Sequence, residues 1–125
     1  MKTTIYSQHY EHTQWLNKLS FYVDEIAIMQ KRIEEIAQKN TSKEVRVKIE
    51  HFQNQLLIQQ NNIDVIKHEI KHDEKQLKNT IMQNEVAVDH KKIEDHVKER
   101  EDVEFFENNF NKLRKELNLF LAEWM

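Results

Sequence analysis

Seven histidines in a chain of 125 residues are the most reactive feature of this sequence. Carboxylates accompany several of them at helical spacing: Glu69 lies three residues before His72, and Asp73 follows His72 directly. Side chains three or four residues apart share one face of a helix. Because imidazole and carboxylate are ligands of zinc, iron and manganese, such a face could contribute to a metal site.

Long helices must bring these residues together, because the histidines are scattered along the chain. Apolar residues recur at alternating spacings of four and three from Trp15 to Ile36 and from Val45 to Leu77, with Gln59 and Asp73 as the polar members of the second run. A third run extends from Phe106 to Trp124. This spacing is typical of helices packed lengthwise against each other.

The breaks between the runs predict helices at about residues 7–39, 42–83 and 92–124. At the first break, Asn40 suits the residue that closes a helix, and Thr41 with Glu44 fits a capping box. So short a connection makes the first two helices antiparallel neighbours. The second connection is predicted within about residues 83–92, where weak helix formers are common.

Composition supports the same fold class. The chain contains no Gly, Pro or Cys, so tight hairpin turns and disulfide scaffolds are not expected. Charged residues make up 33% and hydrophobic residues 38%, as expected for amphipathic helices. We therefore predict an all-α fold, an elongated antiparallel three-helix bundle with coiled-coil-like packing, as a single domain over residues 1–125.

Several classes of function are not expected from the composition. Basic and acidic residues are interleaved and the net charge is −3, which argues against nucleic-acid binding. There is no apolar run of the ~20 residues that a membrane span requires and no apolar signal core, so a cytoplasmic protein without membrane contact is predicted. The chain also has no Gly-rich phosphate loop and no Cys nucleophile, and no catalytic residue is predicted.

The phase of the apolar runs identifies which polar residues could converge. His12 lies on the first run, one step before Trp15; Asp73 lies on the second; and His96 joins the third if Ile93 belongs to it. The candidate metal site is therefore His12, Asp73 and His96, with Glu69 and His72 at its edge, and its metal would be zinc or iron. The alternative, which we favour at this stage, is that no cofactor binds and a His–Asp pair fixes helix register.

The residues His68-Glu69-Ile70-Lys71-His72 match the H-E-x-x-H motif of zinc peptidases. The motif straddles Ile70, a residue of the apolar run, so both histidines are expected to point away from the core. A peptidase is thus a remote alternative.

Six large apolar residues lie outside the apolar runs. Either the third helix covers those that lie on the first two helices, or these residues form a subunit interface. The second alternative predicts a homo-oligomer, or a protein partner bound through the helix faces. These residues are Phe21, Ile28, Ile58, Val65, Phe105 and Leu119.

Short strings of the chain, including Glu50–Gln55 and the pairs Asp89-His90 and Asp95-His96, resemble small uncharacterised helical proteins of Bacteroidota. The resemblance implies a bacterial cytosolic protein and no activity. Our sequence-based hypothesis is a non-enzymatic interaction or scaffold protein of unknown partner. The alternative is a metal-binding helical bundle with a His/carboxylate site at one end.

Overall fold

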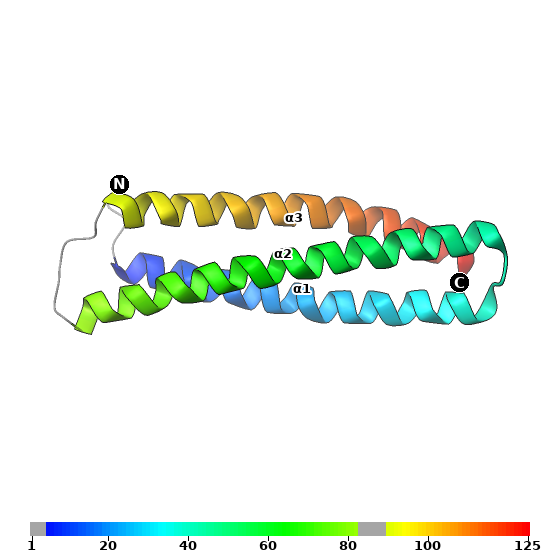
Figure 1. Ribbon diagram of the computed structural model, residues 1–125, viewed down its shortest axis with the longest axis horizontal. Helices are drawn as coiled ribbons and strands as arrows, with labels where there is room; N and C mark the ends of the chain where they lie inside the picture. Colours follow the sequence, from blue (N-terminus) through cyan, green and yellow to red (C-terminus); the bar gives the residue numbers. More distant parts are fainter. Residues whose placement is uncertain (1–4, 83–89) are drawn as a thin grey trace.

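The computed structural model describes residues 5–82 and 90–125, and its regular structure consists of three helices (Figure 1). These are α1 (Ile5–Lys39), α2 (Lys43–Met82) and α3 (His90–Trp124). The prediction of an all-α three-helix bundle is confirmed. Most of the connection predicted within residues 83–92 lies outside the described residues, and α3 already begins at His90.

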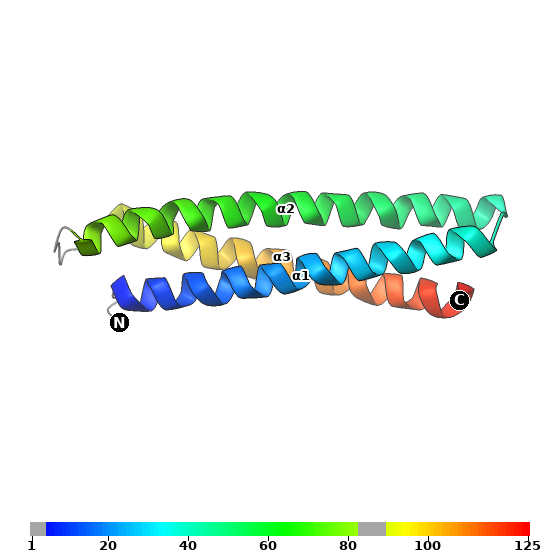
Figure 2. The same ribbon diagram turned by 90° about the horizontal axis from the view of Figure 1, so that it is seen from below.

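The three helices lie side by side along one long axis (Figures 1 and 2). α2 runs antiparallel to both α1 and α3, so α1 and α3 begin at the end of the rod where α2 finishes. We call this the histidine end. At 1.5 Å per residue, the 40 residues of α2 give the rod a length of about 60 Å.

Apolar residues of the three runs form one continuous core along the rod. The runs were predicted from spacing alone, and nearly every member is buried; Asp73 is half-buried and Trp124 packs against the core from its edge. The most deeply buried large side chains include Leu19, Ile33, Ile36, Leu56, Ile63, Ile70, Phe110 and Leu117.

The turn between α1 and α2 is closed by side chains, as expected where no Gly is available. The backbone N–H and the side-chain amide of Asn40 both donate to the Ile36 carbonyl, each at 3.0 Å. At the start of α2 the backbone N–H of Val45 donates to Ser42 Oγ at 3.5 Å. The N-cap is therefore Ser42, one residue after the predicted Thr41.

A ladder of three ion pairs joins α1 to α3, and its members share the same separation in sequence. Glu11 pairs with Arg100, Lys18 with Glu107 and Glu25 with Arg114. Successive rungs are seven residues apart on each helix, and their charges alternate in sign. The Glu25 and Glu11 rungs are bidentate, with both carboxylate oxygens accepting from one guanidinium. This ladder fixes the register of α1 against α3.

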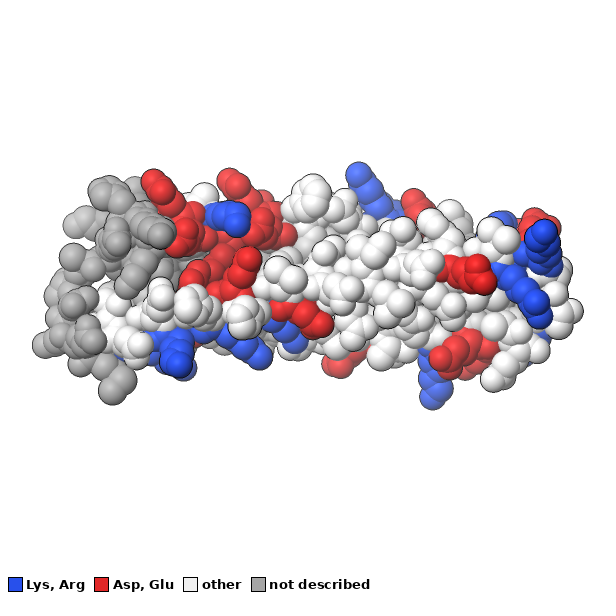
Figure 3. All heavy atoms as spheres, in the orientation of Figure 1, with Lys and Arg blue, Asp and Glu red and all other residues white. Residues whose placement is uncertain are grey.

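The apolar residues outside the runs remain on the surface. Phe105 and Leu119 are exposed on α3 itself, whereas on α1 and α2 Phe21 is 66% exposed, Ile28 55%, Ile58 49% and Val65 59%. The alternative in which the third helix covers these residues is therefore wrong. Uncharged side chains dominate the middle of the face that α2 and α3 form (Figure 3).

None of the helical stretches described combines the length and the hydropathy that would be needed to cross a membrane.

Candidate metal centre

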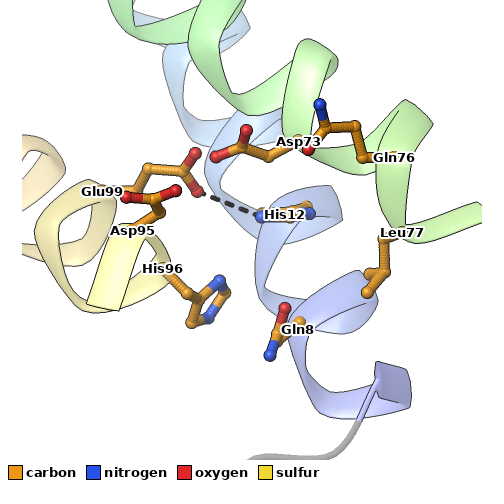
Figure 4. A pocket seen from close by; sticks show the side chains of 8 residues that line it. All are labelled: Gln8, His12, Asp73, Gln76, Leu77, Asp95, His96 and Glu99. Carbon is orange, nitrogen blue, oxygen red and sulfur yellow. Dashed lines mark hydrogen bonds and ion pairs between the residues drawn. The ribbon is translucent and has the colours of Figure 1, made fainter. Parts of the chain in front are cut away.

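The three helices bring buried titratable side chains together at the histidine end (Figure 4). One ligand atom each from His12 on α1 and from His96 and Glu99 on α3 lie within 4.8 Å of one another. His12 and His96 are each 2% exposed and Glu99 is 4% exposed. Such burial is rare for these residue types unless they are paired or bind an ion.

His12 lies between two carboxylates. Its Nδ1 is 2.9 Å from Glu74 Oε1, and its Nε2 is 3.1 Å from Glu99 Oε2. The other oxygen of Glu74 is 2.5 Å from His9 Nδ1. Burial lowers the pKa of His12, but the hydrogen bonds and charges of Glu99 and Glu74 outweigh that effect, and the net pKa is raised. Without a metal, His12 is therefore stabilised as an imidazolium that donates to both carboxylates.

His96 is held from its outer side by a carboxylate that is itself held by an arginine. His96 Nε2 lies 3.0 Å from Glu11 Oε1, and Arg100 donates to both Glu11 oxygens at 2.6 and 3.1 Å. The Arg100 hydrogen bond keeps the pKa of Glu11 below its ordinary value. Because an ionised carboxylate only accepts, Nε2 of His96 must carry a proton.

The inner nitrogen of His96 is left with a lone pair. Burial lowers the pKa of His96, which keeps the ring neutral at pH 7 with its proton on Nε2. Nδ1 is then an acceptor, and this buried atom has no hydrogen-bond partner among the described residues. A buried, unsatisfied acceptor of this kind costs free energy unless a ligand or water satisfies it.

Glu99 also has an unsatisfied oxygen. Its Oε2 contacts His12, whereas its Oε1 is buried without a hydrogen-bond partner in the described chain. Burial raises the pKa of Glu99 to about 7, with Asp73 adding to the rise and His12 opposing it. In Figure 4 the Glu99 carboxyl group points toward both His12 and Asp73. Two facing carboxyl groups favour a proton or a metal cation between them.

A small cavity lies at the centre of these groups. About 20 Å³ is open to the centre of a water molecule, which is room for one water or one ion. Its lining comes from all three helices: Gln8, His12, Asp73, Gln76, Leu77, Asp95, His96 and Glu99. The Trp15 ring packs against both imidazoles, with its centroid 4.9 Å from that of His96 and 5.8 Å from that of His12.

The five residues proposed from sequence are distributed over two neighbouring hollows. His12 and His96 form the buried group, and Asp73 lines the same cavity outside the set of closest ligand atoms. Glu69 and His72 line an adjoining groove instead. His72 is exposed and its ring is 3.2 Å from Gln76 Nε2.

His68, the first histidine of the H-E-x-x-H string, is exposed like His72. Neither ring belongs to the buried group. Their direction away from the core agrees with the phase of the motif around Ile70, and the peptidase alternative gains no support.

Sequence reasoning missed Glu99 and Glu74, and it counted Glu11 among the carboxylates near the histidines without placing it in the site. A signal for Glu99 was present: the third apolar run continues backward from Phe106 through Val103 to Glu99 and His96 at spacings of three, four and three. Glu74 and Glu11 carry no such signal, because they act from beside the run and their partners lie on other helices.

The arrangement fits a first-row divalent metal ion. Two imidazoles and one carboxylate form the ligand set of non-haem iron(II) sites and of many zinc sites. Metal-binding histidines usually donate their other ring nitrogen to a carboxylate, which fixes the tautomer and raises ligand basicity. Glu74 and Glu11 occupy those outer positions for His12 and His96.

Comparison of this chain with protein-family models, with curated proteins and with solved structures found no match.

Proposed function

We propose that this protein is a metal-binding helical bundle that holds one divalent transition-metal ion, zinc or iron(II), between His12, His96 and Glu99. The proposal rests on the buried ligand atoms of His12, His96 and Glu99, which lie within 4.8 Å of one another. Glu74 and Glu11 accept hydrogen bonds from the outer nitrogens of the two histidines. This arrangement favours the metal-binding alternative over the scaffold hypothesis that the sequence alone suggests.

Charge balance distinguishes a cation from a buried water molecule. The neutral ring of His96 presents a lone pair at Nδ1, and Glu99 presents an unsatisfied Oε1. A single water molecule could donate to both acceptors, but it carries no charge to offset the carboxyl groups of Glu99 and Asp73, which line the same cavity. A divalent ion satisfies the acceptors and supplies the missing positive charge, and it would displace the proton between His12 and Glu99.

Metal analysis of the chain purified without a histidine tag tests the proposal directly. We expect one equivalent of zinc or iron per chain, or one equivalent of zinc taken up by the metal-free chain in a calorimetric titration. Glu99→Gln keeps the size of the side chain, and His96→Asn replaces the imidazole by a smaller polar group. Both should abolish uptake while the circular dichroism spectrum stays helical.

The matched control is His72→Asn, which removes a nearby but exposed histidine and should leave uptake unchanged. Failure of the wild-type chain to take up zinc or iron would overturn the proposal, as would unchanged uptake in Glu99→Gln.

We also propose that the exposed apolar residues mediate self-association of the chain. This proposal retains the interaction role in the sequence-based hypothesis. Between Glu50 and Asp64, α2 carries no Asp, Glu, Lys or Arg, although Leu57 and Ile58 are exposed there. Depletion of charge with exposed apolar and aromatic side chains is typical of the centre of an interface. Phe105 and Val65 flank a groove between α2 and α3 on the same side of the bundle.

A further inference from the structure

A second and larger hollow adjoins the metal centre. It lies between α2 and α3, has a volume of about 360 Å³, and is lined by His68, Glu69, His72, Asp73, Asp95, Lys98 and Glu99. Asp73, Asp95 and Glu99 also line the small central cavity, so the two hollows share one wall. We call the larger hollow the acidic groove.

The carboxylates of the acidic groove form a series from the surface to the interior. Asp95 is exposed, Glu69 and Asp73 are half-buried, and Glu99 is 4% exposed. The innermost member holds the unsatisfied Oε1, which lies on the Asp73 side of Glu99 (Figure 4). The groove therefore leads to an atom that a proton or a metal cation would satisfy.

The outer sides of the two imidazoles are covered by described side chains. Glu74 covers Nδ1 of His12, and Glu11 with Arg100 covers Nε2 of His96. The Trp15 ring packs against both imidazoles. The acidic groove is thus a side from which an ion can approach without displacing any of these contacts.

Charge along the groove favours a cation over an anion. Four carboxylates face one lysine, Lys98, and the two groove histidines are exposed. Asp and Glu side chains gather over α2 and α3 near the histidine end in Figure 3. A cleft lined by one sign of charge concentrates counter-ions and raises their association rate by roughly 10- to 1,000-fold.

We propose that the acidic groove is the access route of the metal ion, in which Glu69, Asp73 and Asp95 hold the hydrated cation before Glu99 receives it. This inference rests on the proposed function of the centre. It assigns to Glu69 and Asp95 a role in the rate of binding, because they lie outside the final ligand set.

Stopped-flow measurement with Co²⁺ alone as the probe tests the route. Trp15 contacts both imidazoles, so in a Trp124→Phe background its fluorescence should be quenched when cobalt binds. In the double variant Glu69→Gln/Asp95→Asn, we expect the association rate constant at low ionic strength to fall about tenfold. The number of ions bound and the dissociation rate constant should stay the same. Added salt should slow the parent chain more than the variant.

The matched control is Glu34→Gln/Glu35→Gln, which removes the same charge from exposed positions near the other end of α1. Its association rate should equal that of the parent. The route would be overturned if the groove variant bound cobalt at a rate within twofold of the parent. It would also be overturned if the control variant lost as much association rate, or if only the dissociation rate changed. If the parent chain binds no cobalt, zinc or iron, the proposed function fails and this inference fails with it.

Discussion

Each imidazole of the centre is held on its outer side by a carboxylate, and this arrangement decides which nitrogen is available inside. Glu74 accepts a hydrogen bond from His12 Nδ1–H, and Glu11 accepts one from His96 Nε2–H. This leaves His96 Nδ1 as an unpaired acceptor among the described residues, and His12 Nε2 would become an acceptor when a metal displaces its proton. The outer carboxylates should affect metal affinity without contacting the ion.

Substitution of Glu11 by Gln tests this positioning role. Glu11→Gln keeps a hydrogen-bond acceptor but removes the charge that fixes the His96 tautomer, so we expect zinc affinity to fall by roughly 10- to 100-fold. Isothermal titration with a competing chelator measures the change. Glu107→Gln is the control, since Glu107 also joins α1 to α3 by accepting from Tyr22 and Lys18 but lies away from the centre. Equal losses in both variants would contradict a specific role.

The raised pKa of Glu99 makes the metal-free protein sensitive to pH. Its pKa is about 7 in the folded chain and about 4.5 in an unfolded one, so the folded state binds an extra proton between these values. The stabilising contribution is complete below pH 4.5 and is lost as the pH rises through 7. The raised pKa of His12 acts in the same direction, whereas the lowered pKa of His96 opposes it.

We therefore expect the free energy of unfolding in the presence of a chelator to decrease from pH 5 to pH 8, by roughly 3 kcal/mol from Glu99 alone. Glu99→Gln should flatten this dependence. Urea denaturation at several pH values measures both. A wild-type stability that increases across this range would show that Glu99 is ionised in the folded chain.

At the scale of the helices, the alternating spacing of four and three residues between apolar positions was sufficient to predict the core. Burial follows that pattern from Trp15 to Ile36 and from Val45 to Ile70, because a straight helix can bury only one stripe against its neighbours. Glu99 was missed because it is a charged residue on an apolar stripe, and hydrophobic periodicity alone treats such a residue as a break. The pairing of Glu99 with His12, 87 residues away, depends on register, which periodicity does not specify.

The ladder of Glu11, Lys18 and Glu25 against Arg100, Glu107 and Arg114 supplies that register. A slip of one heptad would place like charges opposite each other, since the sign alternates along both helices. Half-exposed ion pairs contribute little to stability individually, so the ladder is expected to select one alignment more than to stabilise it.

A charge exchange tests the ladder. We expect Glu25→Arg to weaken helix packing through repulsion with Arg114, and Glu25→Arg/Arg114→Glu to restore most of the loss. Thermal unfolding of the single and double variants gives the coupling, which we expect to be about 1 kcal/mol. Zinc affinity provides a second readout, because a register shift would separate His12 from Glu99. If the double variant were no more stable than Glu25→Arg alone, a pairing role for Glu25 and Arg114 would be excluded.

At the scale of the molecule, the rod presents apolar side chains that its own helices leave uncovered. The sequence identifies these residues but does not show whether the third helix or another molecule covers them. Either partner would require apolar residues beside the apolar run of a helix. The exposure of Phe21, Ile28, Ile58 and Val65 shows that α3 does not cover them. A second copy of the chain is the proposed external partner.

Sedimentation velocity over a range of concentrations should therefore detect a dimer or a higher oligomer. Phe105→Gln should weaken this association by at least about tenfold, because a buried aromatic anchor commonly contributes 2 kcal/mol or more to an interface. Tyr6→Gln is the control, as Tyr6 is equally aromatic and 75% exposed but lies in the first turns of α1. A monomer at every concentration would contradict self-association.

The proposed metal centre lies at the end of the rod where polar groups replace the apolar core. The continuous core extends only as far as Trp15, Ile70 and Val103, so beyond these layers the helix ends depend on the polar cluster for cohesion. Metal-free protein should open locally there, and amide hydrogens near His12 and Glu99 should exchange faster than those near Leu56. Saturation with zinc should slow exchange at that end alone, which hydrogen–deuterium exchange would measure. Metal supply would then set how readily proteases attack the two chain segments that begin there, and with it the lifetime of the protein.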